Sequence, residues 1–530
     1  MSLQWQLSRE VPEDMAAIGR VILSEGNPYR QIGDRFDELF PEESVFAPMY
    51  AETGRGVISP LLLSLVTVFQ MLEKVPDRTA AEMVSTRLDW KYALHLPLLY
   101  TGFHFTDLYA FRVRLLEHGQ ERLLFDQILA KLKALGLIKA RGKMRTDSTH
   151  LLAVVHRLTQ LELVTECLRV ALVAATEVAA PWCEQALPQT FREAYSQRQW
   201  EYGLSDSEVK ARLGRAGKDG FWFLAQVEQS APAVVRQLPE VDRLRQVLEQ
   251  QFPQGPDGPA AKRPTGREVI ETPHEVEARY ATKRGQGWIG YKIQVTETCD
   301  DDRPHLIVDL EPTEALSNDS PELANIQARL EKQGTVPGEQ QVDQGYMSGA
   351  NLVKSAEQGI HLVGVPLADT QGPPGFRQAD FRIDPQTRQA VCPAGQSSTI
   401  WSERWRHEKQ PPAILIRFAA RTCQHCPFFG QCTTSRHGRS LTLNPYRAAL
   451  EARRAEANTK AFQERLHLRA GIEATISELV RKHGLRDARY RGEAKIRLQA
   501  YFTAVAVNLK RLIPWLSQQT YTSKLCLSHC

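Results

Sequence analysis

The segment 341-QVDQGYMSGANLV-353 places Asp343 at the end of a short apolar-flanked strand, followed at once by a turn and by a helix expected to begin at Ser348. An aspartate in this position is usually a turn former or a helix cap. A functional role requires other carboxylates at the same place in the fold. The strands and helices predicted around this segment show which other carboxylates could lie beside Asp343.

Alternating apolar and polar residues predict strands on both sides of this segment. One strand is expected to begin near residue 143, and four more are expected over 288–298, 305–312, 341–343 and 361–366. The strands 288–298 and 305–312 are expected to form an antiparallel pair, and a helix over 320–334 leads to Asp343. This order of strands and helices predicts a mixed sheet with helices, an α/β fold.

The rest of the chain is expected to form helical or irregular segments around this sheet. Residues 1–140 are expected to be a helical N-terminal domain, and 141–515 an α/β domain that contains the sheet. The α/β domain is expected to contain a helical insertion over 157–265 and a cysteine-containing insertion over 370–440. Residues 516–530 are expected to be a C-terminal tail.

Three helices are expected within the N-terminal domain. The segment 60-PLLLSLVTVFQMLEK-74 is apolar on nearly every face, which predicts a buried helix capped by Ser59 with Pro60 at its first position. The spacing 79-TAAE-82 predicts a capping box that opens a second helix, and a third covers 106–119. Short helices joined by short turns favour either a helix-turn-helix-like bundle or a plain helical domain.

Charge and hydropathy limit the classes of partner. The net charge of the 530 residues is only +4, but the segment 481–497 carries seven lysines and arginines against two acids. This segment is either a phosphate-contacting surface or a solvated helix face. No run of eighteen apolar residues predicts a membrane span, and the first residues do not resemble a secretory signal. We therefore expect a cytoplasmic protein without membrane contacts.

Two carboxylates are expected to meet at one edge of the sheet. Asp147 lies early on the first strand and Asp343 at the end of a later one, and ligands usually bind at such an edge. Because two carboxylates repel, their pairing needs a cation, and Mg²⁺ is typically held by a few carboxylates with water and phosphate oxygens. A site with two metal ions can activate a hydroxyl and stabilise the leaving oxygen of a phosphodiester.

A third carboxylate is expected on the helix 469–484. Glu473 lies between Ile472 and Ile476, near the expected apolar side, where an unpartnered carboxylate is costly. Arg469 lies one turn earlier and is a possible partner. The alternative is a simple surface pair between Arg469 and Glu473.

Four cysteines indicate a possible structural zinc site. They are Cys392, Cys423, Cys426 and Cys432. The last three form C-x₂-C-x₅-C, and four thiolates can bind zinc tetrahedrally. His425 and His437 are possible substitute ligands, and an iron–sulfur cluster is a minor alternative. The remaining alternative is reduced cysteines packed in a small β-rich insertion.

These motifs together resemble bacterial insertion-sequence transposases of the DDE class, which have a ribonuclease-H-like catalytic fold. The similar subgroup has an N-terminal helical domain of the InsH type. The resemblance extends over nearly the whole chain and is carried by 27-NPYRQIGDRF-36, 145-RTDSTH-150, 288-WIGYKIQVTETCDDD-302, 342-VDQGYMSGANLV-353, 469-RAGIEATISELVRKHGLRDARYRGEAKIRLQ-499 and 508-NLKRL-512.

The resemblance implies a catalytic triad of Asp147, Asp343 and Glu473 that holds two Mg²⁺ ions. It implies that water nicks the transposon end and that the freed 3′-OH attacks target DNA directly. The implied partners are double-stranded DNA with terminal inverted repeats, target DNA and further copies of the chain, at least a dimer on DNA. The alternatives are a catalytically inactive DNA-binding relative and a metal-dependent DNA nuclease.

One motif departs from the pattern of many relatives. Their tyrosine and lysine positions around the glutamate are Leu466 and Val480 here, although Arg469 is retained. The expected DNA-binding residues are Arg469, Arg481, Arg489, Arg491 and Lys495. The apolar helix 498–516 is expected to pack on the sheet.

Overall fold

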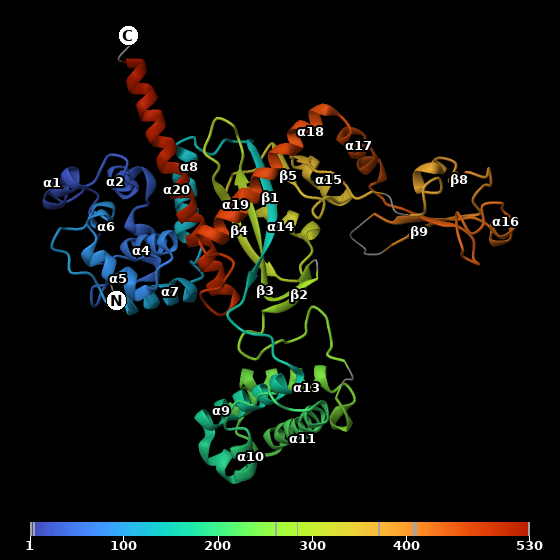
Figure 1. Ribbon diagram of the computed structural model, residues 1–530, viewed down its shortest axis with the longest axis horizontal. Coiled ribbons are helices and arrows are strands. Elements are labelled where there is room, and N and C mark those ends of the chain that lie inside the picture. Colours follow the sequence, from blue (N-terminus) through green and yellow to red (C-terminus); the bar gives the residue numbers. More distant parts are fainter. Residues whose placement is uncertain are drawn as a thin grey trace.

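A mixed six-stranded sheet lies at the centre of the computed structural model, which describes residues 3, 6–259, 262–283, 285–368, 371–405 and 411–527 (Figure 1). Its strands are β1 (Lys143–Leu152), β2 (Arg279–Lys283), β3 (Gln286–Thr298), β4 (Ile307–Glu314), β5 (Glu339–Val342) and β6 (His361–Val363). The order β4-β3-β1-β5-β6 is antiparallel from β4 to β1 and parallel from β1 to β6, and β2 pairs with the start of β3. The predicted mixed α/β sheet is confirmed.

The helices between the later strands begin where the sequence predicts. Helix α14 (Asp319–Lys332) connects β4 to β5, and α15 (Gly349–Glu357) connects β5 to β6. The Ser348 hydroxyl caps α15 by accepting a hydrogen bond from the Asn351 backbone N–H at 3.1 Å. Strand β5 therefore ends one residue before Asp343, and the chain turns away there.

Short helices pack around a buried central helix before the sheet begins. They are α1 (Glu13–Ile22), α2 (Pro28–Asp34), α3 (Phe36–Leu39), η1 (Glu43–Met49), α4 (Pro60–Glu73), α5 (Asp77–Thr86), α6 (Leu88–Ala93), α7 (Thr106–Glu117) and α8 (Leu123–Ala134). The expected cap of α4 is present, since the Ser59 hydroxyl accepts from the Leu62 N–H at 2.9 Å. The capping box predicted at Thr79 is wrong. Helix α5 begins two residues earlier, directly after Pro76.

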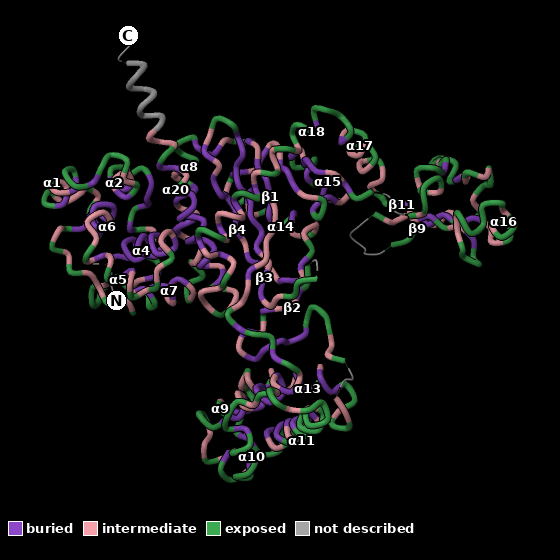
Figure 2. The backbone as a smooth tube through the Cα atoms, in the orientation of Figure 1, coloured by how far each residue is buried: buried purple, intermediate pink, exposed green. Residues whose placement is uncertain are grey.

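Two insertions project from the sheet (Figure 1). The first contains α9 (Gln160–Ala186), α10 (Gln189–Ala194), α11 (Asp206–Ser230), α12 (Ala233–Arg236), α13 (Pro239–Gln251) and η2 (Gly255–Asp257). It has its own hydrophobic core. The second contains β7 (Arg382–Asp384), β8 (Gln389–Val391), β9 (Ile400–Arg404), β10 (Ala413–Arg417), α16 (Ala420–Gln424) and β11 (Ser440–Leu443), with the short turn η3 (Gln378–Asp380). Figure 2 shows that the chain around α16 is mostly exposed.

The C-terminal helices return to the sheet. They are α17 (Arg447–Ala457), α18 (Lys460–His467), η4 (Leu468–Ala470), α19 (Gly471–Ser477), the π-helical turn η5 (Glu478–Lys482) and α20 (Glu493–Leu527). The single helix expected over 469–484 is therefore divided into three short pieces. Helix α20 continues through much of the expected C-terminal tail. None of the helices described is long and apolar enough to cross a membrane.

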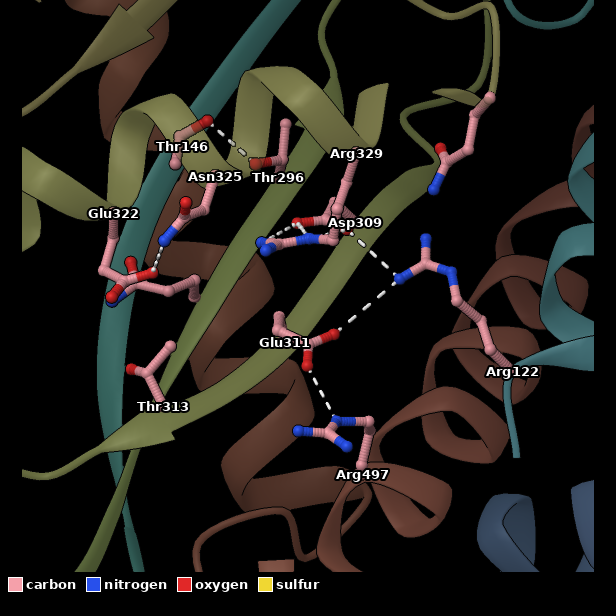
Figure 3. Close-up of polar contacts among 12 residues, drawn as sticks. Arg122, Thr146, Thr296, Asp309, Glu311, Thr313, Glu322, Asn325, Arg329 and Arg497 are labelled. Atoms are coloured by element: carbon pink, nitrogen blue, oxygen red, sulfur yellow. Dashed lines mark hydrogen bonds and ion pairs between the residues drawn. The ribbon is translucent and has the colours of Figure 1, made fainter. Parts of the chain in front are cut away.

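Helix α20 packs on the sheet, as predicted, and also on the N-terminal helices. One continuous hydrophobic core includes Phe69 of α4, Leu310 of β4 and Phe502 of α20. A charged cluster lies beside it (Figure 3). Asp309, which is fully buried, is bound by Arg329 at 2.7 Å and by Arg122 at 3.3 Å. Because Arg122 immediately precedes α8, this cluster connects the N-terminal helices to the sheet.

Candidate active site

The sheet register brings Asp147 and Asp343 side by side. Thr146 of β1 lies opposite Val342 of β5 in the parallel pair, so the next residue on each strand is one of the two aspartates. Their local backbone fixes one oxygen of each carboxylate. Asp147 Oδ1 accepts from the Ser148 N–H at 2.7 Å, and Asp343 Oδ1 accepts from the Gly345 N–H at 2.8 Å.

The pKa of Asp147 is raised above its ordinary value. Burial is the main cause and the charge of Asp343 adds to it, whereas the Ser148 N–H and the cations of Arg469 and Lys283 oppose the rise. The charge of Asp343 therefore disfavours ionisation of Asp147. A bound cation would relieve this repulsion, so the chemistry of the donor set fits a divalent metal such as Mg²⁺.

Arg469 connects the third carboxylate to the pair. Its guanidinium lies 3.2 Å from Asp147 Oδ2 and 3.6 Å from Glu473 Oε1. Arg469 and Asp343 also line one surface pocket of about 290 Å³. The predicted position of Glu473 near the apolar side of its helix is wrong, since its side chain is 68% exposed. This exposure leaves Glu473 accessible to a ligand.

Arg145 and Glu297 hold helix α19 against the sheet. They face each other across β1 and β3, with Arg145 Nε 2.6 Å from an oxygen of the fully buried Glu297. The Glu297 carboxylate also accepts from the Thr475 hydroxyl and from Arg511 Nη1, each at 2.7 Å. A Cβ on Gly471 would lie only 1.9 Å from Arg145 Nη1. Glycine at this position therefore permits the close approach that places Glu473.

Comparison with protein families identifies a transposase domain in the N-terminal part of the chain and another in its C-terminal part. A transposase domain of the DUF772 type matches residues 19–114, and a transposase DDE domain matches residues 391–513. The chain belongs to the DDE transposases. The DDE match includes Glu473, whereas Asp147 and Asp343 lie outside both matched segments. No curated protein and no solved structure matches this transposase.

The mixed sheet of the transposase agrees with the ribonuclease-H-like fold expected for its class. The carboxylates do not, however, converge on one point. Within the described ranges, no group of three or more His, Cys, Asp or Glu side chains is arranged so that it could hold a metal ion. Asp147 and Glu473 do not converge because the Arg469 guanidinium lies between them and binds both carboxylates.

The four cysteines of the transposase share one small pocket. Cys392, Cys423, Cys426 and Cys432 all line a cavity of about 30 Å³, together with aromatic side chains that include Phe418. Burial raises the pKa of the Cys432 thiol, and the other three cysteines add to the rise. Their arrangement is nevertheless not a metal site in the part of the chain that the structure describes, so the predicted zinc site finds no support.

The predicted DNA-binding residues lie in different surroundings. Arg491 and Lys495 are exposed and line a pocket of about 240 Å³ between α7 and the start of α20, and Arg481 is also exposed. Arg489 differs, because its Nη2 donates to the Val75 carbonyl at 2.7 Å. Arg489 thus joins the N-terminal helices to the C-terminal region and is not favoured as a phosphate contact.

Several residues near the acids were missed at the sequence level. Lys283, at the end of β2, is close enough to influence the pKa of Asp147. Asp319 and Gln294 lie behind the Asp343 turn and interact with each other at 3.3 Å. The signal available was the alternation of polar residues along β3, where Lys292, Gln294 and Thr296 share a face.

Proposed function

We propose that this transposase cleaves DNA at transposon ends and joins the freed 3′-OH to target DNA, with Asp147, Asp343 and Glu473 as the acidic triad. The observation that carries the proposal is the register of β1 and β5, which brings two aspartates together, with Arg469 linking the first to Glu473. Two carboxylates paired with Arg469, and a third that lines the same open pocket as Arg469, suit a reaction on a phosphodiester.

Each residue has a distinct part in the proposed reaction. Asp147 and Asp343 would hold two Mg²⁺ ions, and the exposed Glu473 would complete the set of ligands. Bound metal would supply activation of the attacking hydroxyl and stabilisation of the leaving oxygen. Arg469, which faces the same pocket as Asp343, would hold the phosphate group that is cleaved.

The proposed DNA path follows the exposed cations. Arg481, Arg491 and Lys495 would contact the phosphate backbone of the transposon end, so binding is expected to weaken as salt rises. Helix α7, one of the N-terminal helices within residues 1–140, lines the same pocket as Arg491, and the N-terminal helices are proposed to bind the transposon end with it. Two transposon ends require at least a dimer of the transposase.

The test is cleavage and joining of labelled DNA that carries the inverted repeats of the element, in Mg²⁺, by full-length wild type and by Asp343→Asn. Asp206→Asn, on the exposed first turn of α11, is the control. We expect the wild type and the control to give 3′-OH nicks and joined products. The Asp343→Asn variant is expected to bind the DNA and to give neither product.

The other outcomes separate the alternatives. Equal activity of the wild type and Asp343→Asn would remove Asp343 from the site. Nicks without joined products, even from a pre-nicked end, would indicate a metal-dependent nuclease. Binding without cleavage by the wild type would indicate a DNA-binding relative that has lost activity.

A further inference from the structure

A fourth carboxylate lies directly behind Asp343. Asp319 is the first residue of α14, and its side chain is 20% exposed. Gly345 separates the two acids, since a Cβ placed on it would lie 3.1 Å from Asp343 Oδ1 and 3.3 Å from Asp319 Oδ2. Asp319 therefore approaches the Asp343 turn closely, although it lies 24 residues earlier in the sequence and on a different element.

Asp319 belongs to a chain of buried polar groups that ends at this turn. Its Oδ1 accepts from Gln294 Nε2 at 3.3 Å, and Gln294 Oε1 in turn accepts from the Tyr346 hydroxyl. Tyr346 is fully buried, and Gln294 is fully buried as well. Ser148, the residue next to Asp147, lies opposite Gln294 across β1 and β3. The hydrogen bonds thus connect α14, β3 and the Asp343 turn, and the β1 strand that carries Asp147 is paired with β3 beside them.

The Tyr346 backbone is held as firmly as its side chain. Its N–H donates to the Asp343 carbonyl at 3.3 Å, which closes the turn. Its carbonyl accepts from Asn351 Nδ2 at 2.7 Å, and the same amide donates to the carbonyl of Ser320, beside Asp319, at 2.7 Å. A buried tyrosine with both ends satisfied fixes the backbone around it, because breaking either contact would leave a polar group unpaired.

We propose that Asp319 is a positioning residue for Asp343, acting through Gln294 and Tyr346. This inference rests on the proposed function, since it assumes that the position of Asp343 matters for metal binding. Asp319 sets the orientation of Gln294, Gln294 sets the Tyr346 hydroxyl, and Tyr346 sets the turn that presents the Asp343 carboxylate beside Asp147.

The contacts of Asp319 favour positioning over direct metal binding. Its Oδ1 already accepts from Gln294 and also from Lys292 Nζ at 3.2 Å. Lys292 Nζ also donates to the Ser317 carbonyl at 2.6 Å, so this cation is fixed at Asp319 and offsets its charge. A carboxylate neutralised in this way serves as a hydrogen-bond acceptor. An asparagine, which keeps an acceptor oxygen, should therefore replace it.

The test measures Mn²⁺ binding to the full-length, DNA-free protein by the electron paramagnetic resonance of free Mn²⁺. The variants are Asp319→Ala, Asp319→Asn, Tyr346→Phe, the double variant Asp319→Ala/Tyr346→Phe and Asp343→Asn. Glu322→Gln is the matched control, because it is the other acid in the first turn of α14 and bonds only to Asn325 at 3.1 Å among the contacts described (Figure 3). Cleavage is measured in parallel, and circular dichroism confirms folding.

We expect Asp319→Ala and Tyr346→Phe each to raise the Mn²⁺ concentration for half-saturation about tenfold, as the loss of one buried hydrogen bond would. Asp319→Asn should stay within about threefold of the wild type because it keeps the acceptor. The double variant should also show about a tenfold effect, not a hundredfold one, since both changes break one chain. Glu322→Gln should not change the midpoint.

Three results would overturn the inference. If Asp319→Asn lost Mn²⁺ binding as fully as Asp343→Asn, Asp319 would be a metal ligand. If Asp319→Ala bound Mn²⁺ as the wild type does while Asp343→Asn did not, Asp319 would have no part in the site. If the two single effects multiplied in the double variant, the residues would act independently. Wild-type cleavage by Asp343→Asn would instead overturn the proposed function itself.

Discussion

Helix α19 and the π-helical turn after it have two very different sides. On the sheet side, Glu297 is fully buried and is bound by Arg145, Arg511 and the Thr475 hydroxyl. On the outer side, Glu473 is 68% exposed and is paired only with Arg469, at 3.6 Å, among the contacts described. Both sides carry a glutamate and arginines, but only one of them satisfies its carboxylate within the protein.

This difference in burial distinguishes residues that stabilise the structure around the site from residues that are accessible to a ligand. A buried carboxylate with three donors has no capacity left for a ligand, and its removal leaves buried cations unpaired. An exposed carboxylate with one distant partner contributes little to stability and remains available to a metal ion. The sheet side should therefore control the stability of the fold, and the outer side should control the proposed reaction.

The largest effect on stability is expected for Glu297→Ala. Because Arg145 and Arg511 would be left without their carboxylate, the free energy of unfolding should fall by about 3–5 kcal/mol. Urea unfolding, with hydrogen exchange in β1 and β3 to identify the transition, measures this change. Glu314→Ala is the control, since Glu314 is 43% exposed where it pairs with Arg267. Similar losses in both variants would show that burial does not distinguish them.

A smaller loss in the free energy of unfolding is expected for Gly471→Ala. The added Cβ would collide with the Arg145 guanidinium, which Glu297 holds in place, so the variant should lose about 1–3 kcal/mol. In Gly214→Ala on α11 the new Cβ has no neighbour within 4 Å, and alanine should stabilise that helix by up to about 1 kcal/mol. Opposite signs in the same urea assay are expected. Stabilisation by both changes would contradict the tight packing of α19.

A pH-dependent loss of stability is expected for Glu478→Gln. Burial raises the pKa of this carboxyl, but Lys510 and Arg511 lower it more, so its pKa lies below the ordinary value. A lowered pKa gives stability that is complete above the ordinary glutamate pKa of about 4.3 and is lost as pH falls below it. The wild type should therefore exceed Glu478→Gln in stability by a constant amount above about pH 5, and the difference should shrink below that pH. A difference that grew in acid would reverse the assigned sign.

The smallest effect on stability is expected for Glu473→Gln. An exposed pair of this kind contributes little, so unfolding should change by less than about 0.5 kcal/mol. The same variant should lose DNA cleavage, because the third acid of the proposed triad is gone. Glu464→Gln, on an exposed part of α18, should change neither property. A strongly destabilised but active Glu473→Gln variant would remove the distinction between the two sides of α19.

Local patterns were sufficient to predict most of the sheet. The succession of strands and helices along the chain, the antiparallel pairing of β3 with β4, the end of the strand at Asp343 and the Ser348 cap all depend on nearby residues, and the structure agrees with them. The exposure of Glu473 could not be predicted from local patterns. It depends on the division of the expected helix into 3₁₀, α and π pieces, and on Arg145, which fills the space beside Gly471.

Contacts between distant parts of the sequence could not be predicted from local patterns either. Arg489 was expected on the DNA-binding surface because it stands in a basic segment, but it binds the Val75 carbonyl, 414 residues away. Asp319 was missed for a similar reason, since an acid in the first turn of a helix is ordinarily explained by the helix dipole. Only the packing of α14 against β3 brings it to the Asp343 turn.

Helix α20 has a consequence for the order in which the protein is made. It supplies part of the core to both α4 and β4, yet it begins at Glu493, after every acid of the proposed triad. A ribosome that has completed Glu473 has therefore made all three acids but not the helix on which the N-terminal bundle and the sheet both pack. Chain synthesis itself thus delays assembly of the proposed DNA-cutting centre, and unfinished chains are expected to be inactive.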